Sequence, residues 1–133
     1  MKKVLFIMML AIGSLVQLNA QEKKNWVEMH QFHSVMGKSF HPAEEGKLQP
    51  LKDNAAQLLE KAEAWQKSVV PQGYNKTVTA PILKDLVAQC KVIKKAVADK
   101  KSDEELTKLI TKAHDIFHEI MEKCQKGEED HKH

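Results

Sequence analysis

The chain has 133 residues, and its 21 basic residues stand against 18 acidic ones, so the formal charge is small and positive. Every one of the basic residues is a lysine. Because arginine is the side chain that grips phosphate and guanine with two parallel hydrogen bonds, its absence argues against a nucleic-acid-binding protein.

The first twenty residues have the three parts of a signal peptide. Lys2 and Lys3 form a charged start, residues 4–16 are mostly apolar, and Leu18-Asn19-Ala20 is a suitable cleavage site. The apolar stretch is short for a membrane span and no second one follows, so we expect no membrane association after cleavage. No cysteine follows the cleavage site for lipid attachment. The chain is therefore predicted to mature as a periplasmic or secreted protein.

Two helices are predicted in the first half of the mature chain. The first runs from Asn25, a suitable N-cap, to Phe40, because the residue before Pro42 avoids the helical backbone conformation. The second covers residues 50–68, where a proline suits the first helical position. Proline and glycine in the segment 70–73 then mark its exit.

Two more helices are predicted in the second half. The third begins near Thr79, with Pro81 in its first turn, and ends at the connection formed by residues 99–101. A serine and a glutamate three residues apart form a capping box at 102–105, which starts the fourth helix. This helix is expected to end before Gly127.

Apolar residues recur with helical spacing in these segments, and no useful stretch alternates with the period of a strand. Short connections favour antiparallel neighbours, so the predicted fold is all-α, an antiparallel up-down-up-down four-helix bundle over residues 21–126. Residues 127–133 are predicted to form a flexible charged tail, in which His131 and His133 are solvated.

Histidines interrupt the apolar face of the first helix. On a helical wheel one face holds Trp26, Met29, His30, His33, Met36, Gly37 and Phe40. A buried neutral imidazole needs partners for both nitrogens, and an unsatisfied buried polar group costs about 1–3 kcal/mol. Two histidines that face the core would therefore lower the stability of the fold if they served packing alone. This face indicates a binding site.

The fourth helix carries a matching pair. His114 and His118 are four residues apart, so their imidazoles lie one turn apart on one face and are spaced to bind one ion. Because the first and fourth helices are neighbours in such a bundle, we expect His114 near the height of His30 and within about one turn of His33. The sequence predicts a metal site formed by His33, His114 and His118, with His30 as the next ligand.

Other residues extend the predicted site. His41, beside Glu44 and Glu45, is expected to cap a helix end or to join the ligands together with Glu45 or a methionine, and Cys90 is expected at a similar height. Nitrogen donors with soft sulfur nearby favour zinc or copper over calcium or magnesium. The predicted function is binding, buffering, delivery or sensing of this metal ion.

The same residues bear on other classes of function. A hydrolytic zinc enzyme would need His-Glu-x-x-His, and His118-Glu119 lacks the second histidine. The Glu-x-x-His pattern of di-iron proteins is not present on two helices, so the chain is not predicted to be an enzyme. If the histidines only hydrogen-bond one another, the alternative is a structural or partner-binding bundle without a cofactor. The sequence leaves a homodimer open.

Cys90 and Cys124 are the only cysteines. An oxidising compartment makes a disulfide the first hypothesis, but the helical layout separates the two residues by roughly 12 Å, more than a disulfide spans. The alternative is that both are small buried apolar side chains.

The predicted architecture, with two local features, resembles the superfamily of periplasmic four-helix cytochromes, the soluble b-type cytochrome and cytochrome c-prime. Ile116-Phe117-His118 resembles the position of the haem-binding histidine, and residues 81–85 resemble the proline-led start of the third helix. The resemblance implies an alternative function, electron transfer by non-covalent haem b held between His118 and Met29 or Met36. The chain lacks the Cys-x-x-Cys-His run needed for covalent haem. It also has histidines outside the haem pattern, which favour a bare ion.

Overall fold

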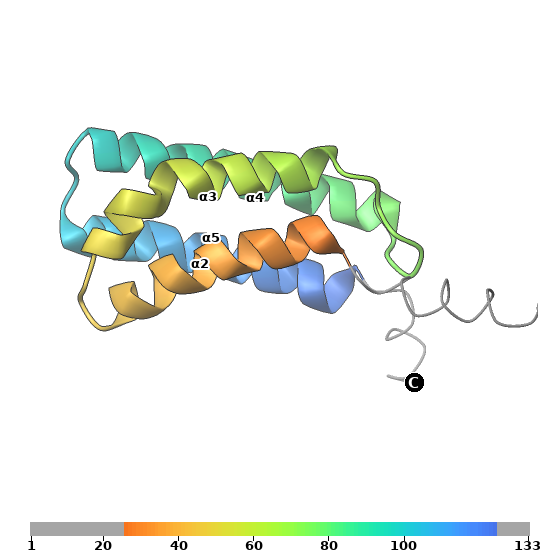
Figure 1. Ribbon diagram of the computed structural model, residues 1–133, viewed down its shortest axis with the longest axis horizontal. Helices are drawn as coiled ribbons and strands as arrows, with labels where there is room; N and C mark the ends of the chain where they lie inside the picture. Colours follow the sequence, from red (N-terminus) through yellow and green to blue (C-terminus); the bar gives the residue numbers. More distant parts are fainter. Residues whose placement is uncertain (1–25, 125–133) are drawn as a thin grey trace, which may run out of the picture.

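The computed structural model describes residues 26–124, which form four helices (Figure 1). In chain order these are α2 (Val27–Glu44), α3 (Gln49–Lys67), α4 (Lys76–Ala98) and α5 (Asp103–Lys123). Residues 26–124 contain no strand, and the predicted all-α class is confirmed. The predicted signal peptide, residues 1–20, and the predicted tail, residues 127–133, lie outside the described residues. None of the helices within 26–124 combines the length and apolar character needed to cross a membrane.

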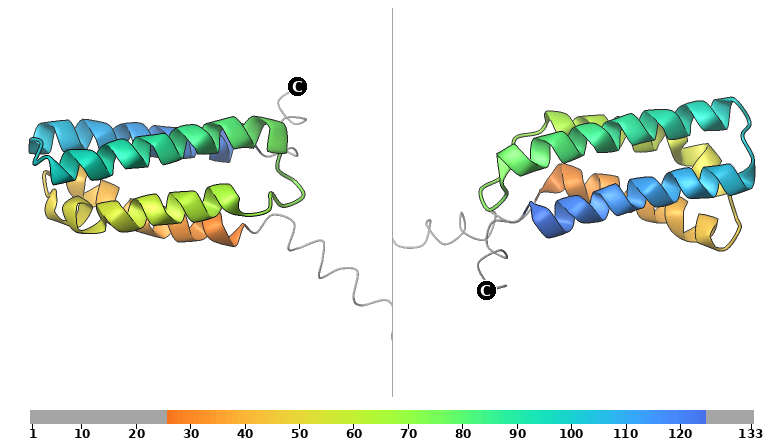
Figure 2. Two further views of the ribbon diagram at one scale, coloured as in Figure 1. Left: turned by 90° about the horizontal axis from the view of Figure 1, so that it is seen from above. Right: turned by 180° about the vertical axis from the view of Figure 1, so that it is seen from behind.

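Successive helices run in opposite directions and close into a four-helix bundle (Figures 1 and 2). The indole Nε1 of Trp26 donates to Ser68 Oγ at 2.8 Å, which joins the start of α2 to the end of α3. The backbone N–H of Asn75 donates to the carbonyl of Cys124 at 2.7 Å, which joins the start of α4 to the end of α5. Each helix packs against the next one, and α2 also packs against α5. The predicted up-down-up-down bundle is therefore the observed arrangement.

The end of α2 differs from the prediction. The helix continues past Phe40 and through Pro42, although this proline has no N–H to donate to the carbonyl four residues before it, and it ends two residues later at Glu44. Gly46, with φ of 82°, then stops the helix. Its N–H donates to the Ala43 carbonyl at 3.0 Å, and the N–H of Lys47 donates to the Pro42 carbonyl at 2.9 Å. This pair of bonds is a Schellman motif, which glycine favours.

The start of α4 also differs, whereas the start of α5 is as predicted. The helix begins at Lys76, before Thr79, because the side chain of Asn75 accepts a hydrogen bond from the Thr77 N–H at 3.1 Å and caps it. The proline expected in the first turn lies one turn further along. At the start of α5, Ser102 Oγ accepts from the backbone N–H of Glu105 at 3.1 Å, as the capping box requires.

Lys100 lies between α4 and α5 with φ of 57°, a left-handed conformation that side chains with a Cβ adopt at a cost. Its N–H donates to the Val97 carbonyl at 3.1 Å, and the N–H of Lys101 donates to the Ala96 carbonyl at 3.0 Å. We expect Lys100→Gly to raise the free energy of unfolding by about 1 kcal/mol, measured by urea denaturation, because glycine has no such steric cost. The matched control, Lys101→Gly, should give no gain, and an equal gain there would contradict this explanation.

Four aromatic rings fill the core toward the end of the bundle where α2 begins. Phe32 contacts Trp65 and Phe117 with ring centroids 5.5 and 5.8 Å apart. Trp65 contacts Phe117 at 5.8 Å and meets Trp26 edge-on at 5.7 Å. All four side chains are almost fully buried. The Trp65 N–H has no hydrogen-bond partner within the described part of the chain, and it lies among rings whose faces attract such positive edges.

Candidate metal centre

The buried face of α2 is not the one that the wheel predicted. Its buried residues are Met29, Phe32, Val35, Met36, Ser39, Phe40 and Ala43. Phe32 and Val35 widen the apolar stripe on the side away from the histidines, so the helix turns to bury them. His30 and His33 are consequently exposed. The expectation that these two histidines point into the core is wrong.

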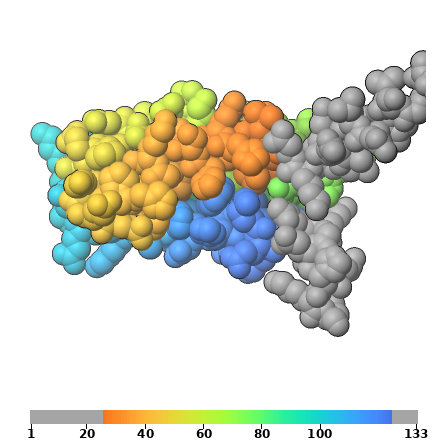
Figure 3. Space-filling view, turned by 60° about the horizontal axis from the view of Figure 1, so that its bottom comes forward, coloured from red at the N-terminus to blue at the C-terminus, as the bar shows by residue number. Residues whose placement is uncertain are grey.

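Histidines of α2 and α5 instead lie along the surface where the two helices meet. The imidazole of His114 stacks on the ring of Phe40, with centroids 3.8 Å apart and planes 9° apart. The imidazole of His33 stacks on Phe117 at 4.9 Å and 21°. We call His33, Phe40, His114, Phe117 and His118 the α2–α5 seam. Figure 3 looks onto this side, where the orange and yellow surface of α2 borders the blue surface of α5.

The register of this seam also differs from the prediction. His114 was expected at the height of His30, but it lies against Phe40, between two and three turns further along α2. In the structure α5 ends at Lys123, and His114 lies about two and a half turns from that end. Counting the same distance from Val27 reaches Met36, about one turn before Phe40. His114 therefore lies near the C-terminal half of α2.

His114 and His118 bring two imidazole nitrogens close together along the seam. Their Nε2 atoms lie 3.2 Å apart, and their rings are nearly perpendicular, with centroids 4.4 Å apart. Two nitrogens bound to one tetrahedral zinc ion at the usual bond length would lie about 3.3 Å apart. The pair already has the separation that two ligands of one ion require. The predicted convergence of these two imidazoles is present.

His41 and Glu44 lie near this pair, at the end of α2. Nδ1 of His41 is 3.5 Å from Glu44 Oε1, and both side chains are exposed. The His41 ring is 5.5 Å from Phe40, the ring on which His114 stacks. A carboxylate at Nδ1 leaves Nε2 available for a metal, which is a common arrangement around metal-binding histidines. Glu44 was not predicted as a ligand, whereas the predicted Glu45 is an exposed residue at the C-cap of α2.

The pKa of His114 is lowered from its ordinary value of 6.5. Partial burial of the ring is the main cause, and His118 and His41 lower the pKa further, while Asp115 and Glu44 oppose the shift. The ring is therefore neutral at pH 7. A neutral imidazole is the form that binds metal ions, so no proton has to be displaced from His114.

This pKa shift predicts how stability depends on pH. Because the folded protein resists protonation of His114 more than the unfolded chain does, the contribution to stability is complete above about pH 6.5 and is lost as the pH falls through the lowered pKa. We expect a flatter decline in the free energy of unfolding between pH 7 and pH 5 for His114→Gln than for the wild type. Urea denaturation in the presence of a chelator measures both profiles, and parallel profiles would contradict the assignment.

The structure does not bring all the predicted ligands together. Within residues 26–124, no three side chains of histidine, cysteine, aspartate or glutamate are close enough together to hold a metal ion without moving. His33 lies against Phe117, and His30 lies about one turn closer to the start of α2. The two imidazoles of α5 are therefore the centre of the candidate site, and a third ligand requires movement of a side chain or a bound water.

The cysteines are not suited to the site. Both are buried, and no disulfide joins Cys90 to Cys124. Burial raises the pKa of the Cys90 thiol to about 12, so it stays protonated at neutral pH, whereas metals bind the thiolate. The alternative of two small buried apolar side chains is the observed one. Cys90 supplies no soft donor to the seam.

The described residues do not fit a haem. Met29 and Met36 are buried, and the Tyr74 hydroxyl donates to Met29 Sδ at 3.8 Å. His118, the other expected axial ligand, is exposed. A macrocycle between them would need an open interior slot, but the rings around Phe117 fill the interior at this height. The packing of residues 26–124 therefore leaves no place for a haem between His118 and either methionine.

Comparison with known proteins adds no family to these observations. No family model matches the chain, and no curated protein or solved structure gave a significant match. The resemblance to the four-helix cytochromes therefore stays a prediction from a few residues.

Proposed function

We propose that this protein binds a transition metal ion, zinc or copper, at the exposed pair His114 and His118, and that it buffers, delivers or senses the ion. The observation that carries the proposal is the 3.2 Å separation of the two Nε2 atoms, which suits two ligands of one ion. Histidines four apart on a helix hold this geometry without help from a loop.

A third ligand from α2 would complete the site. His41 is the first candidate, because its Nδ1 already faces Glu44 and its Nε2 is the nitrogen left for the metal. Both His41 and Glu44 lie close enough to His114 to influence its pKa. Rotation of these exposed side chains would bring one of them into the coordination shell, and water would fill the remaining position.

The exposure of the site supports exchange of the ion rather than a structural role. Structural zinc sites have four protein ligands and are closed to solvent. Here His118 and His41 are exposed, and only His114 is half-buried. An ion at this place would be reached by water and by other proteins. The signal-like residues 1–20 support a site of action in the periplasm or outside the cell.

A structural or partner-binding bundle is the second candidate, and the same contact supports it. A separation of 3.2 Å is also a hydrogen-bond distance, in which one imidazole donates its Nε2–H to the other. In that case the pair links two turns of α5 and needs no ion.

Elemental analysis separates these candidates. After equilibration with a slight excess of Zn²⁺ or Cu²⁺ and removal of unbound ion, the protein is expected to retain about one equivalent per chain. His118→Ala should lose this equivalent, whereas the double variant His131→Ala/His133→Ala should keep it. An unaltered protein that retains no metal would reject the metal function and favour the structural candidate.

A further inference from the structure

A pocket lies between the end of α3, the loop that follows it and the first turns of α4. Its volume is about 570 Å³, within the range typical of small-molecule sites. None of its lining residues belongs to α2 or α5. The pocket is therefore separate from the α2–α5 seam, and what it binds does not depend on the proposed metal.

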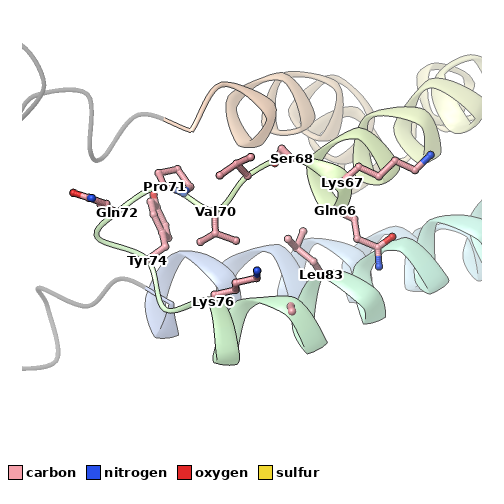
Figure 4. Close-up of a pocket in the computed structure, with 11 residues that line it drawn as sticks. Gln66, Lys67, Ser68, Val70, Pro71, Gln72, Tyr74, Lys76 and Leu83 are labelled. Atoms are coloured by element: carbon pink, nitrogen blue, oxygen red, sulfur yellow. The ribbon is translucent and has the colours of Figure 1, made fainter.

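The walls of this pocket are mostly apolar. Figure 4 shows Val70, from the loop, and Leu83, from α4, pointing into the space between the two segments. Leu83 and Tyr74 are buried and form the floor of the pocket, so the accessible apolar surface comes from Val69, Val70 and Pro71. Val69, next to Val70, is 88% exposed, which is unusual for a large aliphatic side chain. A ligand with an alkyl body would cover this surface.

The charged residues of the pocket have one sign. Within residues 26–124, the pocket is lined by Lys67 and Lys76 and by no aspartate or glutamate. The first turn of α4, which begins at Lys76, carries no acidic residue either. The partial positive charge of a helix N-terminus adds to the charge of the lysines. The pocket is therefore complementary to an anion with an apolar body.

We propose that this pocket binds a small alkyl carboxylate. The alkyl chain lies against Val69 and Val70, above the buried Leu83, and the carboxylate faces Lys76. The ligand needs both its alkyl chain and its carboxylate. A pair of surface lysines alone binds an anion weakly in water, and contact with the apolar walls supplies the larger part of the binding free energy.

The residues after Cys124 are a weaker candidate for this place. The Asn75 N–H donates to the Cys124 carbonyl, so the chain leaves α5 close to the start of α4. Residues 125–133 carry an acidic run, Glu128-Glu129-Asp130, but no apolar side chain. They would pair with the lysines and leave Val69 and Val70 uncovered.

The test uses octanoate as the probe and methyl NMR of the purified protein as the readout. We expect octanoate to shift the methyl signals of Val70 and Leu83, and acetate and octyltrimethylammonium to have little effect at the same concentration. Lys76→Gln should weaken octanoate binding about fivefold or more. Lys91→Gln, an exposed lysine of the same helix outside the pocket, should leave it unchanged.

Three results would overturn the proposal. Equal shifts from octanoate and octyltrimethylammonium would show an apolar groove without preference for charge. Equal weakening in Lys76→Gln and Lys91→Gln would show a general effect of protein charge. If octanoate shifts these methyl signals only after residues 125–133 are deleted, the protein's own tail is the occupant.

Discussion

Replacing Phe117 by alanine is expected to lower the free energy of unfolding by about 3–5 kcal/mol. The Phe117 side chain is only 2% exposed, and its ring contacts Phe32 and Trp65 in the core and His33 at the surface. Removal of the ring leaves a cavity where α5 packs against α2 and α3. Urea denaturation followed by far-ultraviolet circular dichroism measures the change.

Ile116→Ala is the matched control for this substitution. Ile116 is the preceding residue on α5, but it is only partly buried and packs at the edge of the core. We expect a clearly smaller loss of stability for it than for Phe117→Ala. Similar losses for the two variants would mean that Phe117 is not at the centre of the core contacts between α2, α3 and α5.

Loss of His118 is expected to weaken binding of Zn²⁺ or Cu²⁺ by about 10- to 100-fold or more, because even residues that only orient a ligand have effects of this size. His118 is exposed, so His118→Ala should fold with little change in stability. His114→Ala should weaken binding to the same extent, and the double variant should lose little more, since the two rings act as a unit. Competition with a coloured chelator measures the affinities.

His30→Ala is the control for the metal site. His30 is an exposed histidine of α2 that lies toward the other end of the seam from Phe40 and His114. Its replacement should change the affinity by less than about twofold, well below the loss for a ligand. If His30→Ala and His118→Ala weaken binding equally, the ion is not held by the α5 pair.

The division into helices is predictable because local signals determine it. The capping box at Ser102 and Glu105, the proline at the start of α3 and the glycine-containing exit after it act within a few residues. The two errors, at Pro42 and at the start of α4, have the same origin. In both places a proline suggests a boundary, whereas the residues that set the boundary are Gly46 and Asn75.

The orientation of α2 is not predictable from a wheel alone. Apolar residues occupy more than half of its circumference, so two faces are candidates for burial. Phe32 and Val35 determine which face is buried, because their burial stabilises the fold more than the burial of His30 and His33 would. The choice depends on the shape of the facing core, above all on Trp65 and Phe117, which sequence periodicity does not describe.

The pairing of His114 and His118 is predictable from their spacing on one helix, whereas their neighbours on α2 are not. Contacts across two helices depend on the register between them, and a register error of a few residues displaces every partner. Phe40 was expected on the histidine face but not against His114, and of the two carboxylates beside His41 the predicted ligand was Glu45 and not Glu44. An aromatic residue directly before His41 and a carboxylate three residues after it were the available signals.

The most direct test of the metal site is long-range ¹H–¹⁵N NMR of the imidazole rings during titration with Zn²⁺. The Nε2 signals of His114 and His118 are predicted to change together and to reach their limits at one equivalent, while the signals of His30 stay unchanged. If His131 and His133 respond first and the Nε2 signals of the α5 pair do not move, the protein has no metal site at the α2–α5 seam.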